Sequence, residues 1–366
     1  MLAVLRDFTL AESPGTEKAS ADRCAELIAA EWRKRNLRVE LIAQKIRGNH
    51  IRAEWRPRTA TKSVSQLLVL GHYDTVYATG TLTKMPFGKV GRKVFGPGVF
   101  DMKAGIVQAL FALDALFAMN ALLQKQVVFL WTSDEEIGSE SSRKLLESEA
   151  RRSDAVFVLE PSLGPKGLLK TARKGVGEAE LTVYGKASHA GLAPEKGINA
   201  VHELALQLAK IVEWNDLHRG ITVNADVVHG GTRVNVIAER AAATLDLRAL
   251  HLSDMHAVEK KLRALKPVLR GAKLELTGGF TRPPLERKVS AQLFTRAKNI
   301  AAQMGLALGE GTAGGASDGN FTAALGIPTL DGLGAVGDGA HSRHEHILAP
   351  AMPERAALLA ALLAGS

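Results

Sequence analysis

Cysteine is nearly absent from this sequence, since Cys24 is the only one among 366 residues. A single cysteine excludes an internal disulfide bond and a zinc site built from cysteines, and it suits a reducing cytoplasm. Long apolar runs are missing too: the C-terminal "AALLAALLAG" is too short to span a bilayer. Arg6 and Asp7 interrupt the N-terminal segment where a signal peptide would stay apolar. We therefore expect a cytoplasmic protein without a membrane partner, or a periplasmic or secreted one if the native N-terminus was trimmed.

Positive charge is in excess, with a net charge of +9. The basic residues are densest between Arg33 and Lys62, where they alternate with apolar residues as on the exposed faces of a helix and two strands. Neither an aromatic–basic RNA-binding pattern nor a zinc-finger spacing accompanies them. We expect no nucleic-acid partner. The alternative, a polyanion-binding protein, would show binding that falls steeply with salt.

The length of the chain, with 46% apolar residues, exceeds the usual size of one hydrophobic core and predicts two domains. In the segment 65–160, the strand-like runs "QLLVLGHYD", "VVFLWTSDEE" and "DAVFVLEPS" alternate with helical ones. This order predicts an α/β fold with a mostly parallel mixed sheet flanked by helices. From Gly175 onward, alternating runs predict an antiparallel sheet with two helices, at roughly 195–214 and 253–270. We expect a first domain over 1–174 and 283–366, interrupted by a smaller α+β domain over 175–282.

Acidic and histidine residues follow several of the predicted strands or lie in glycine-rich loops. They are His72 and Asp74 in "GHYDTV", Asp101 in "GPGVFDMKAG", Glu135 and Glu136 in "TSDEEIGS", Glu160 in "LEPS", and His341 in "GAHS". Taken singly, each has an ordinary structural interpretation, such as a helix cap or a solvated surface group. Ligands of open α/β sheets gather at the carboxyl ends of strands. Two histidines and three carboxylates there would suit two zinc ions that share a bridging carboxylate, with a further carboxylate left as general base.

These motifs, with "GKASHAG" and "GGASDG" in the same order, resemble the M20 family of di-zinc metallopeptidases, and most of all its glutamate carboxypeptidase branch. The resemblance covers nearly all of the chain beyond residue 65. It implies a catalytic α/β domain interrupted by a lid domain through which the chain forms a homodimer. It also implies two Zn²⁺ per chain, with Co²⁺ or Mn²⁺ as possible substitutes. The peptide bond between Asp101 and Met102 is expected to be cis, as is frequent in such families.

By the same resemblance, His72 and Glu160 bind one zinc, Glu136 and His341 bind the other, and Asp101 bridges both. Asp74 orients His72, a common arrangement for a ligating histidine. Glu135 is the general base that takes a proton from a metal-bridging water and delivers it to the leaving nitrogen. The two zinc ions would thus offset the repulsion among the three consecutive acids that begin at Asp134. Asp134 itself is expected to brace the turn, whereas His344 and His346 are expected at the surface.

The lid domain is expected to contribute substrate contacts. The resemblance implies that His189 donates to the oxyanion in the partner subunit's active site. Asn235 and Arg248 hold the substrate near its free carboxylate, because a guanidinium can bind both carboxylate oxygens. The alternative for Arg248 is a surface ion pair with Asp246. Gly314 and Gly315 are expected to let the backbone approach the bound substrate.

The substrate stays open at this stage. The resemblance implies hydrolysis of an amide next to a free carboxylate in a small peptide or an N-acyl amino acid. A carboxypeptidase is the first choice, and an N-acyl amino acid deacylase or a di- or tripeptidase is the alternative. Glutamate-selective members have a lysine after the "EPS"-like glutamate, but here Leu168 takes that position, flanked by Lys166 and Lys170. Strict glutamate selectivity is therefore not expected from this segment.

Overall fold

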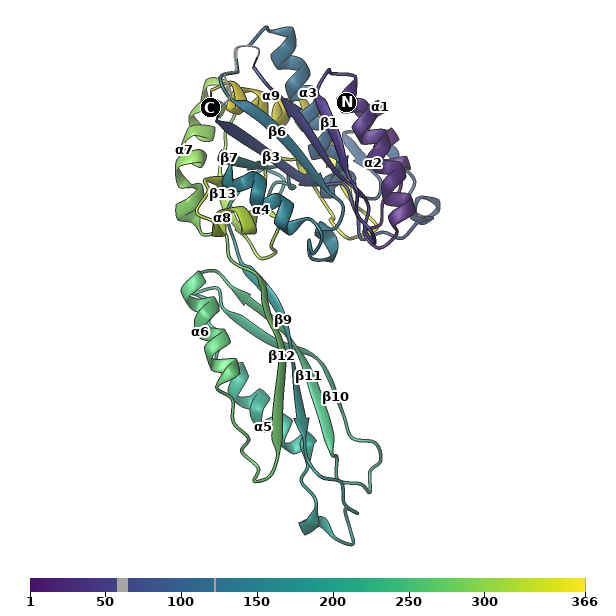
Figure 1. Cartoon of the computed structure of the whole chain (residues 1–366), viewed down its shortest axis with the longest axis vertical. Helices are drawn as coiled ribbons and strands as arrows, with labels where there is room; N and C mark the ends of the chain where they lie inside the picture. The colour runs from purple at the N-terminus through teal and green to yellow at the C-terminus, as the bar shows by residue number, and fades with distance from the viewer. Residues whose placement is uncertain (58–64, 122, 366) are drawn as a thin grey trace. The chain divides into compact units, whose positions relative to one another are not determined.

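The computed structural model describes residues 1–57, 65–121 and 123–365, and it shows two compact units (Figure 1). The first unit consists of Met1–Ala172, Arg287–Ala313 and Ser317–Ser366. The second unit consists of Arg173–Glu286 together with Gly314–Ala316. Each unit has its own hydrophobic core, so each is described by itself.

The first unit is built on a six-stranded sheet in the order β1-β2-β6-β3-β7-β14. The strands β6, β3, β7 and β14 run parallel, and β2 and β1 extend the sheet in antiparallel fashion. This mostly parallel mixed sheet confirms the predicted fold class. The strand bounds are β1 (Arg38–Ile42), β2 (His50–Trp55), β3 (Gln66–His72), β6 (Gln126–Thr132), β7 (Ser153–Val158) and β14 (Thr329–Leu330).

Both faces of this sheet are buried, which is why its central strands are continuous apolar runs. Leu67, Val69 and Phe129 face a large core shared with α1, α2, α3, α7 and α9. Leu68 and Leu130, each adjacent in sequence to at least one of these residues, face a second core shared with α4 and α8. Successive side chains of a strand point to opposite faces, which explains this division. The helices are α1 (Leu2–Leu10), α2 (Lys18–Arg33), α3 (Ala104–Ala118), α4 (Arg143–Arg151), α7 (Arg287–Gln303), α8 (Gly319–Ala324) and α9 (Ala351–Ala364).

Two smaller strand groups complete the first unit. One is a four-stranded sheet in the order β15-β16-β5-β4, made of β15 (Gly337–Asp338), β16 (His346–Leu348), β5 (Lys93–Phe95) and β4 (Gly88–Val90). The other is the pair β8 (Leu169–Arg173) and β13 (Glu310–Ala313). Pairing of β16 with β5 joins segments about 250 positions apart, a contact that matters for the site below.

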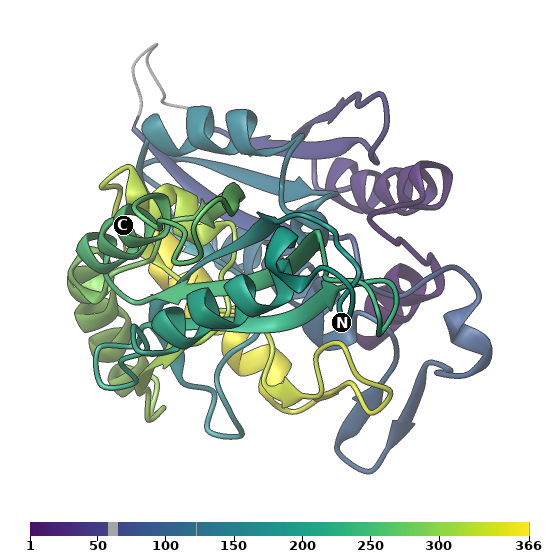
Figure 2. The same cartoon turned by 90° about the horizontal axis from the view of Figure 1, so that it is seen from below.

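The second unit is an antiparallel sheet with two helices, in the strand order β10-β11-β9-β12 (Figures 1 and 2). Its strands are β9 (Gly175–Tyr184), β10 (Thr222–Gly230), β11 (Arg240–Ala249) and β12 (Lys273–Arg282). The helices α5 (Ala200–Val212) and α6 (Leu252–Arg263) pack on the sheet around Leu181, Leu204 and Leu245. Alternate residues of β11 are buried, as expected for a strand with one face in a core.

Both helices of the second unit are shorter than the sequence predicts. Helix α5 begins only after Asn199, whose side chain accepts hydrogen bonds from the N–H groups of Val201 and His202. Helix α6 ends at Arg263, before Pro267, which disfavours helical geometry in the residue that precedes it. Among the described residues, no helix is long and apolar enough to cross a membrane.

Candidate metal centre

The predicted ligands gather at one edge of the main sheet. His72 is the last residue of β3, Glu136 lies in the turn Glu135–Ile137 after β6, and Glu160 follows β7. Since β6, β3 and β7 are adjacent and parallel, their carboxyl ends meet at this edge. Asp101 comes from the loop before α3, and His341 from the loop between β15 and β16.

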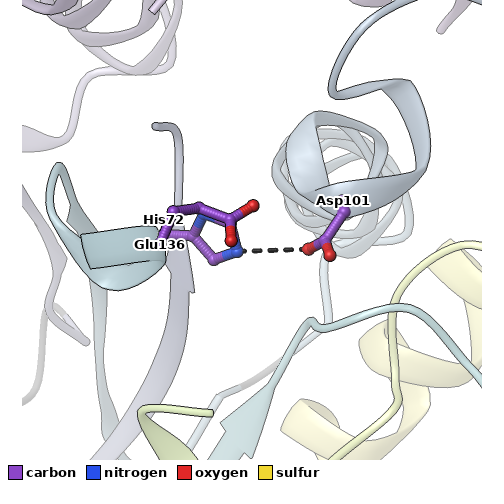
Figure 3. Close-up of side chains that lie close together, drawn as sticks. All are labelled: His72, Asp101 and Glu136. Atoms are coloured by element: carbon purple, nitrogen blue, oxygen red, sulfur yellow. Dashed lines mark hydrogen bonds and ion pairs between the residues drawn. The ribbon is translucent and has the colours of Figure 1, made fainter. Parts of the chain in front are cut away.

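Asp101 faces both histidines, one with each carboxylate oxygen. Its Oδ1 lies 3.2 Å from Nε2 of His72, and its Oδ2 lies 3.5 Å from Nε2 of His341 (the first pair is shown in Figure 3). A second carboxylate accompanies each imidazole: Glu160 Oε1 is 3.3 Å from His72 Nε2, and Glu136 Oε2 is 3.1 Å from His341 Nε2. The peptide bond from Asp101 to Met102 is cis, which confirms that prediction.

These spacings suit a pair of metal ions. Ligand atoms about 2.0–2.1 Å from a tetrahedral zinc are about 3.3 Å apart, close to the four distances above. The donor set, imidazole nitrogen and carboxylate oxygen, is also the one that zinc prefers in catalytic sites. Ligand atoms of His72, Asp101 and Glu136 lie within 4.8 Å of one another, and so do those of His72, Glu135 and Glu160.

The charges in this cluster shift one another's pKa. Burial alone would lower the pKa of His72, but hydrogen bonds with Asp101, Asp74 and Glu160 raise it well above its usual value. Hydrogen bonds with Asp101 and Glu136 raise the pKa of His341 to about 10. Burial would raise the pKa of Asp101, yet hydrogen bonds from the two imidazoles hold it far below its ordinary value.

The cluster therefore attracts cations. Besides Asp101, the carboxylates of Asp74, Glu136 and Glu160 are clustered around His72 and His341, and few of their atoms reach solvent. Burial also raises the pKa of Glu136, as expected where negative charge is crowded. Two imidazolium groups cannot balance so many carboxylates, whereas divalent cations can. The residues present thus fit a dinuclear metal site.

Asp74 supports the centre in two ways. Its Oδ1 lies 3.4 Å from Nδ1 of His72, and its main-chain oxygen is 3.0 Å from the same nitrogen. The carboxylate also accepts hydrogen bonds from the backbone N–H groups of Glu135 and Glu136, at 3.2 and 3.1 Å. The predicted partner of His72 is therefore also an anchor of the adjacent turn, which the sequence did not indicate.

His189 and Asn235 lie next to each other in the second unit. Both are exposed, and the N–H of Ala190 donates to the main-chain oxygen of Asn235 at 2.9 Å. Nδ1 of His189 accepts hydrogen bonds from the N–H groups of Gly191 and Leu192, each at 3.1 Å. A neutral imidazole with Nδ1 as acceptor carries its proton on Nε2, so His189 presents a donor to its surroundings.

Arg248 has a partner within the second unit. Its guanidinium donates to both carboxylate oxygens of Asp246, with Nη2 2.7 Å from Oδ2, and each side chain is about one-third exposed. Its Nη1 lies 3.4 Å from the oxygen of Gly314. A Cβ atom on Gly314 or Gly315 would meet nothing within 4 Å, so internal packing does not require glycine at either position.

The structure corrects one expectation near His341 and adds a residue there. His346 is buried rather than at the surface, and its ring lies 5.3 Å from that of Phe95, because β16 pairs with β5. Its neighbour Glu345 is fully buried and bonds to the loop that carries Asp101. No local motif marks Glu345, whose partners include the backbone N–H groups of Gly98, Phe100 and Asp101.

Comparison with known proteins agrees with this geometry. The sequence profile of "Peptidase family M20/M25/M40" matches residues 68–365. The chain is 32% identical to carboxypeptidase G2 of Pseudomonas sp. (strain RS-16) over 302 residues, covering 81% of this chain and 73% of the relative. It is 29% identical to a succinyl-diaminopimelate desuccinylase of Dechloromonas aromatica (strain RCB) over 361 residues, covering 93% and 92%.

Solved structures share the fold. The aminopeptidase PepT of Bacillus cereus ATCC 10987 gives a TM-score of 0.83 at 21% identity, covering 99% of this chain and 97% of the other. The Bacillus subtilis YXEP protein, described as a dinuclear metal-binding peptidase of family M20, gives 0.75 at 16% identity, covering 99% and 96%. Fold and site thus define a metal-dependent hydrolase of peptide or related amide bonds. The chain belongs to peptidase family M20/M25/M40.

Proposed function

We propose that this enzyme is a carboxypeptidase, which hydrolyses the amide bond next to a free carboxylate and releases a C-terminal amino acid. The observation that carries the hydrolytic part of the proposal is the position of Asp101, whose two oxygens face two different histidines, each with a second carboxylate beside it. The likeness to carboxypeptidase G2 supports this activity over the others in the family. A small peptide or an N-acyl amino acid would be the substrate.

The residues divide into two ligand sets. His72 and Glu160 would hold one metal ion, His341 and Glu136 the other, and Asp101 both. Two Zn²⁺ ions suit this donor set, and Co²⁺ or Mn²⁺ could substitute. When bound, they supply a Lewis acid for the scissile carbonyl and a water of lowered pKa as the nucleophile.

Glu135 would move the proton. As general base, its carboxylate accepts a proton from the attacking water and returns it to the leaving nitrogen, so that the amine departs neutral. Asp74 anchors the backbone of both Glu135 and Glu136, which lets adjacent glutamates take different tasks on one rigid turn. Asp74 also holds Nδ1 of His72 and leaves Nε2 to face the ligand set.

The second unit would serve as lid and dimerisation domain, over residues 175–282 between catalytic segments 1–174 and 283–366. His189 of one subunit would donate from Nε2 to the oxyanion formed in the partner subunit. Asn235 and Arg248 would bind near the substrate carboxylate, and Gly314 and Gly315 would let the backbone approach it. The Arg248–Asp246 pair is partly exposed, and such pairs contribute about 0–1 kcal/mol. A substrate carboxylate could therefore displace Asp246.

A substrate panel tests this proposal. The zinc-loaded enzyme is offered dipeptides, acyl-glutamates of the folate type, other N-acyl amino acids, and N-succinyl or N-acetyl diamino acids. A carboxypeptidase releases the C-terminal amino acid from peptides and acyl-glutamates at the highest kcat/KM. Preference for N-succinyl or N-acetyl diamino acids would refute it in favour of a deacylase, the activity that the desuccinylase relative suggests.

Two alanine variants test the division of labour in the turn. Glu135→Ala should abolish turnover while metal content, measured by atomic emission, stays near two per chain. Glu136→Ala should lose metal together with activity. Glu140→Ala is a matched control, because this exposed glutamate lies in the same segment and should change neither quantity. Loss of metal in Glu135→Ala would mean that Glu135 is itself a ligand, as its position near His72 and Glu160 allows.

A further inference from the structure

Glu345 is a buried acid that lies close to the proposed metal centre without belonging to its ligand set. It follows His341 by four residues, and its side chain is fully buried. Its carboxylate accepts hydrogen bonds from three backbone donors of one loop. The N–H of Gly98 donates to Oε2 at 3.0 Å, and those of Phe100 and Asp101 donate to Oε1 at 2.8 and 3.0 Å.

This carboxylate joins the loop of Asp101 to the loop of His341. The main-chain oxygen of Glu345 also accepts a hydrogen bond from Gly96, at 3.5 Å, and β16 pairs with β5 directly after it. On the other side, the Tyr77 hydroxyl donates to the oxygen of Ser342 at 3.0 Å. The two loops are therefore connected through protein atoms, independently of any metal ion.

The loop that precedes Asp101 needs such a partner. Gly98 has a φ of +72°, in the left-handed region, and a Cβ there would lie 2.5 Å from Cγ2 of Thr75. In this conformation the N–H groups of residues 98, 100 and 101 do not point along a helix or sheet ladder, and buried donors without acceptors are costly. A carboxylate satisfies all three with charge-assisted bonds, which are about twice as strong as neutral ones.

We propose that Glu345 is a positioning residue, which sets the place of Asp101 relative to His341. The inference rests on the proposed function, because it matters for catalysis only if these two residues share a metal ion. Oδ2 of Asp101 and Nε2 of His341 are 3.5 Å apart, and both belong to segments that Glu345 holds. His72, by contrast, is fixed in β3 by the strand ladder. Loss of the carboxylate should therefore affect the site shared with His341 more than the site of His72.

The experiment compares Glu345→Gln with the unmodified protein in Co²⁺ titrations followed by visible absorption. Glutamine keeps the shape of the side chain but turns an NH₂ group toward one of the backbone donors. Mutation of groups that orient metal ligands typically costs about 10–100-fold in metal affinity or activity. We expect one of two Co²⁺ binding steps to weaken by this factor, with an altered spectrum, and kcat at saturating metal to fall while KM changes little.

Glu203→Gln is the matched control. Glu203 is equally buried and also accepts backbone hydrogen bonds, from Val268 and Leu269, but it lies in the second unit. Its variant should lower the free energy of unfolding without changing Co²⁺ affinity. If Glu345→Gln does not fold, Tyr77→Phe replaces it, because the Tyr77 hydroxyl interacts with the Glu345 carboxylate and bonds to Ser342 in the loop of His341. This variant should shift the same binding step by a smaller factor.

The outcomes separate the two claims. If the unmodified protein binds two Co²⁺ ions and cleaves a panel substrate, but Glu345→Gln matches it within about twofold, Glu345 is only a structural brace and this inference is refuted. If the unmodified protein neither takes up Co²⁺ nor cleaves any substrate of the panel, the proposed function fails first and the inference falls with it. Weakening of only the Co²⁺ binding step that belongs to the site of His72 would also contradict the proposed positioning.

Discussion

Replacing Asp134 by alanine would remove the brace behind the turn 135–137. The Oδ2 atom of this fully buried acid accepts three hydrogen bonds: from the N–H of Ser141 at 2.7 Å, from the Ser141 hydroxyl at 2.7 Å, and from the N–H of Ser142 at 3.3 Å. Since the acid is fully buried and Ser141 and Ser142 are largely so, the lost acceptor leaves donors that are poorly placed to bond to bulk water. The loss should therefore appear in the free energy of unfolding.

The contacts set the size of this loss. The Ser141 hydroxyl also lies 3.2 Å from Nε2 of His50 and keeps that partner. Two backbone N–H groups are then left without an acceptor, at about 1–3 kcal/mol each, so Asp134→Ala should lose about 2–6 kcal/mol. Asp134→Asn can keep an oxygen toward the same donors. Its amide nitrogen would occupy the place of Oδ1, an atom without a hydrogen-bond partner among the described residues, so it should lose only about 1 kcal/mol.

Urea denaturation of the metal-free protein, followed by tryptophan fluorescence, measures these losses. Three of the four tryptophans, Trp32, Trp55 and Trp131, lie in the first unit and report on it. Displacing a catalytic group by about 1 Å can cost about 100-fold in rate. If Glu135 is the base, as proposed, Asp134→Ala should also reduce kcat to that extent. A change below about 0.5 kcal/mol, or an equal loss in the alanine and asparagine variants, would refute the reasoning from unpaired donors.

Three further predictions concern other parts of the chain. His189→Ala should lower kcat about a hundredfold or more, as for loss of an oxyanion donor. Mixing this variant with Glu135→Ala should restore activity in heterodimers. No recovery of activity in verified heterodimers would contradict a shared site. The buried guanidinium of Arg355 donates to three main-chain carbonyls, so Arg355→Leu should lower the free energy of unfolding by about 1–3 kcal/mol for each carbonyl left without a donor. A neutral result in denaturation would contradict this. Burial lowers the pKa of His50, so the unfolded state binds more protons as the pH falls below 6.5, and stability falls with it. Denaturation of the unmodified protein and of His50→Gln is measured over the same series of pH values. The free energy of unfolding should depend less steeply on pH in the variant, and an unchanged slope would show that other groups cause the dependence.

Helix boundaries show where local patterns were insufficient. Apolar periodicity indicated both helices of the second unit but extended them to about 195–214 and 253–270, past the observed Ala200–Val212 and Leu252–Arg263. Periodicity measures which face can be buried, whereas the ends depend on hydrogen bonds such as those that Asn199 accepts. His346 was misjudged for a related reason, because its burial comes from strand pairing across about 250 positions.

The side chains of the proposed metal site could be predicted from the sequence alone. Metal ligation demands particular side chains, and His72, Asp101 and His341 stand in motifs at strand ends or in glycine-rich loops, where a reader of the sequence can find them. The contacts that hold these residues in place became visible only in the folded chain. Glu345 and Asp134 act mainly on backbone N–H groups, which every residue but proline carries, so a pattern of side chains does not mark most of their partners. Those contacts exist only because folding brings buried acceptors to donors that would otherwise have none.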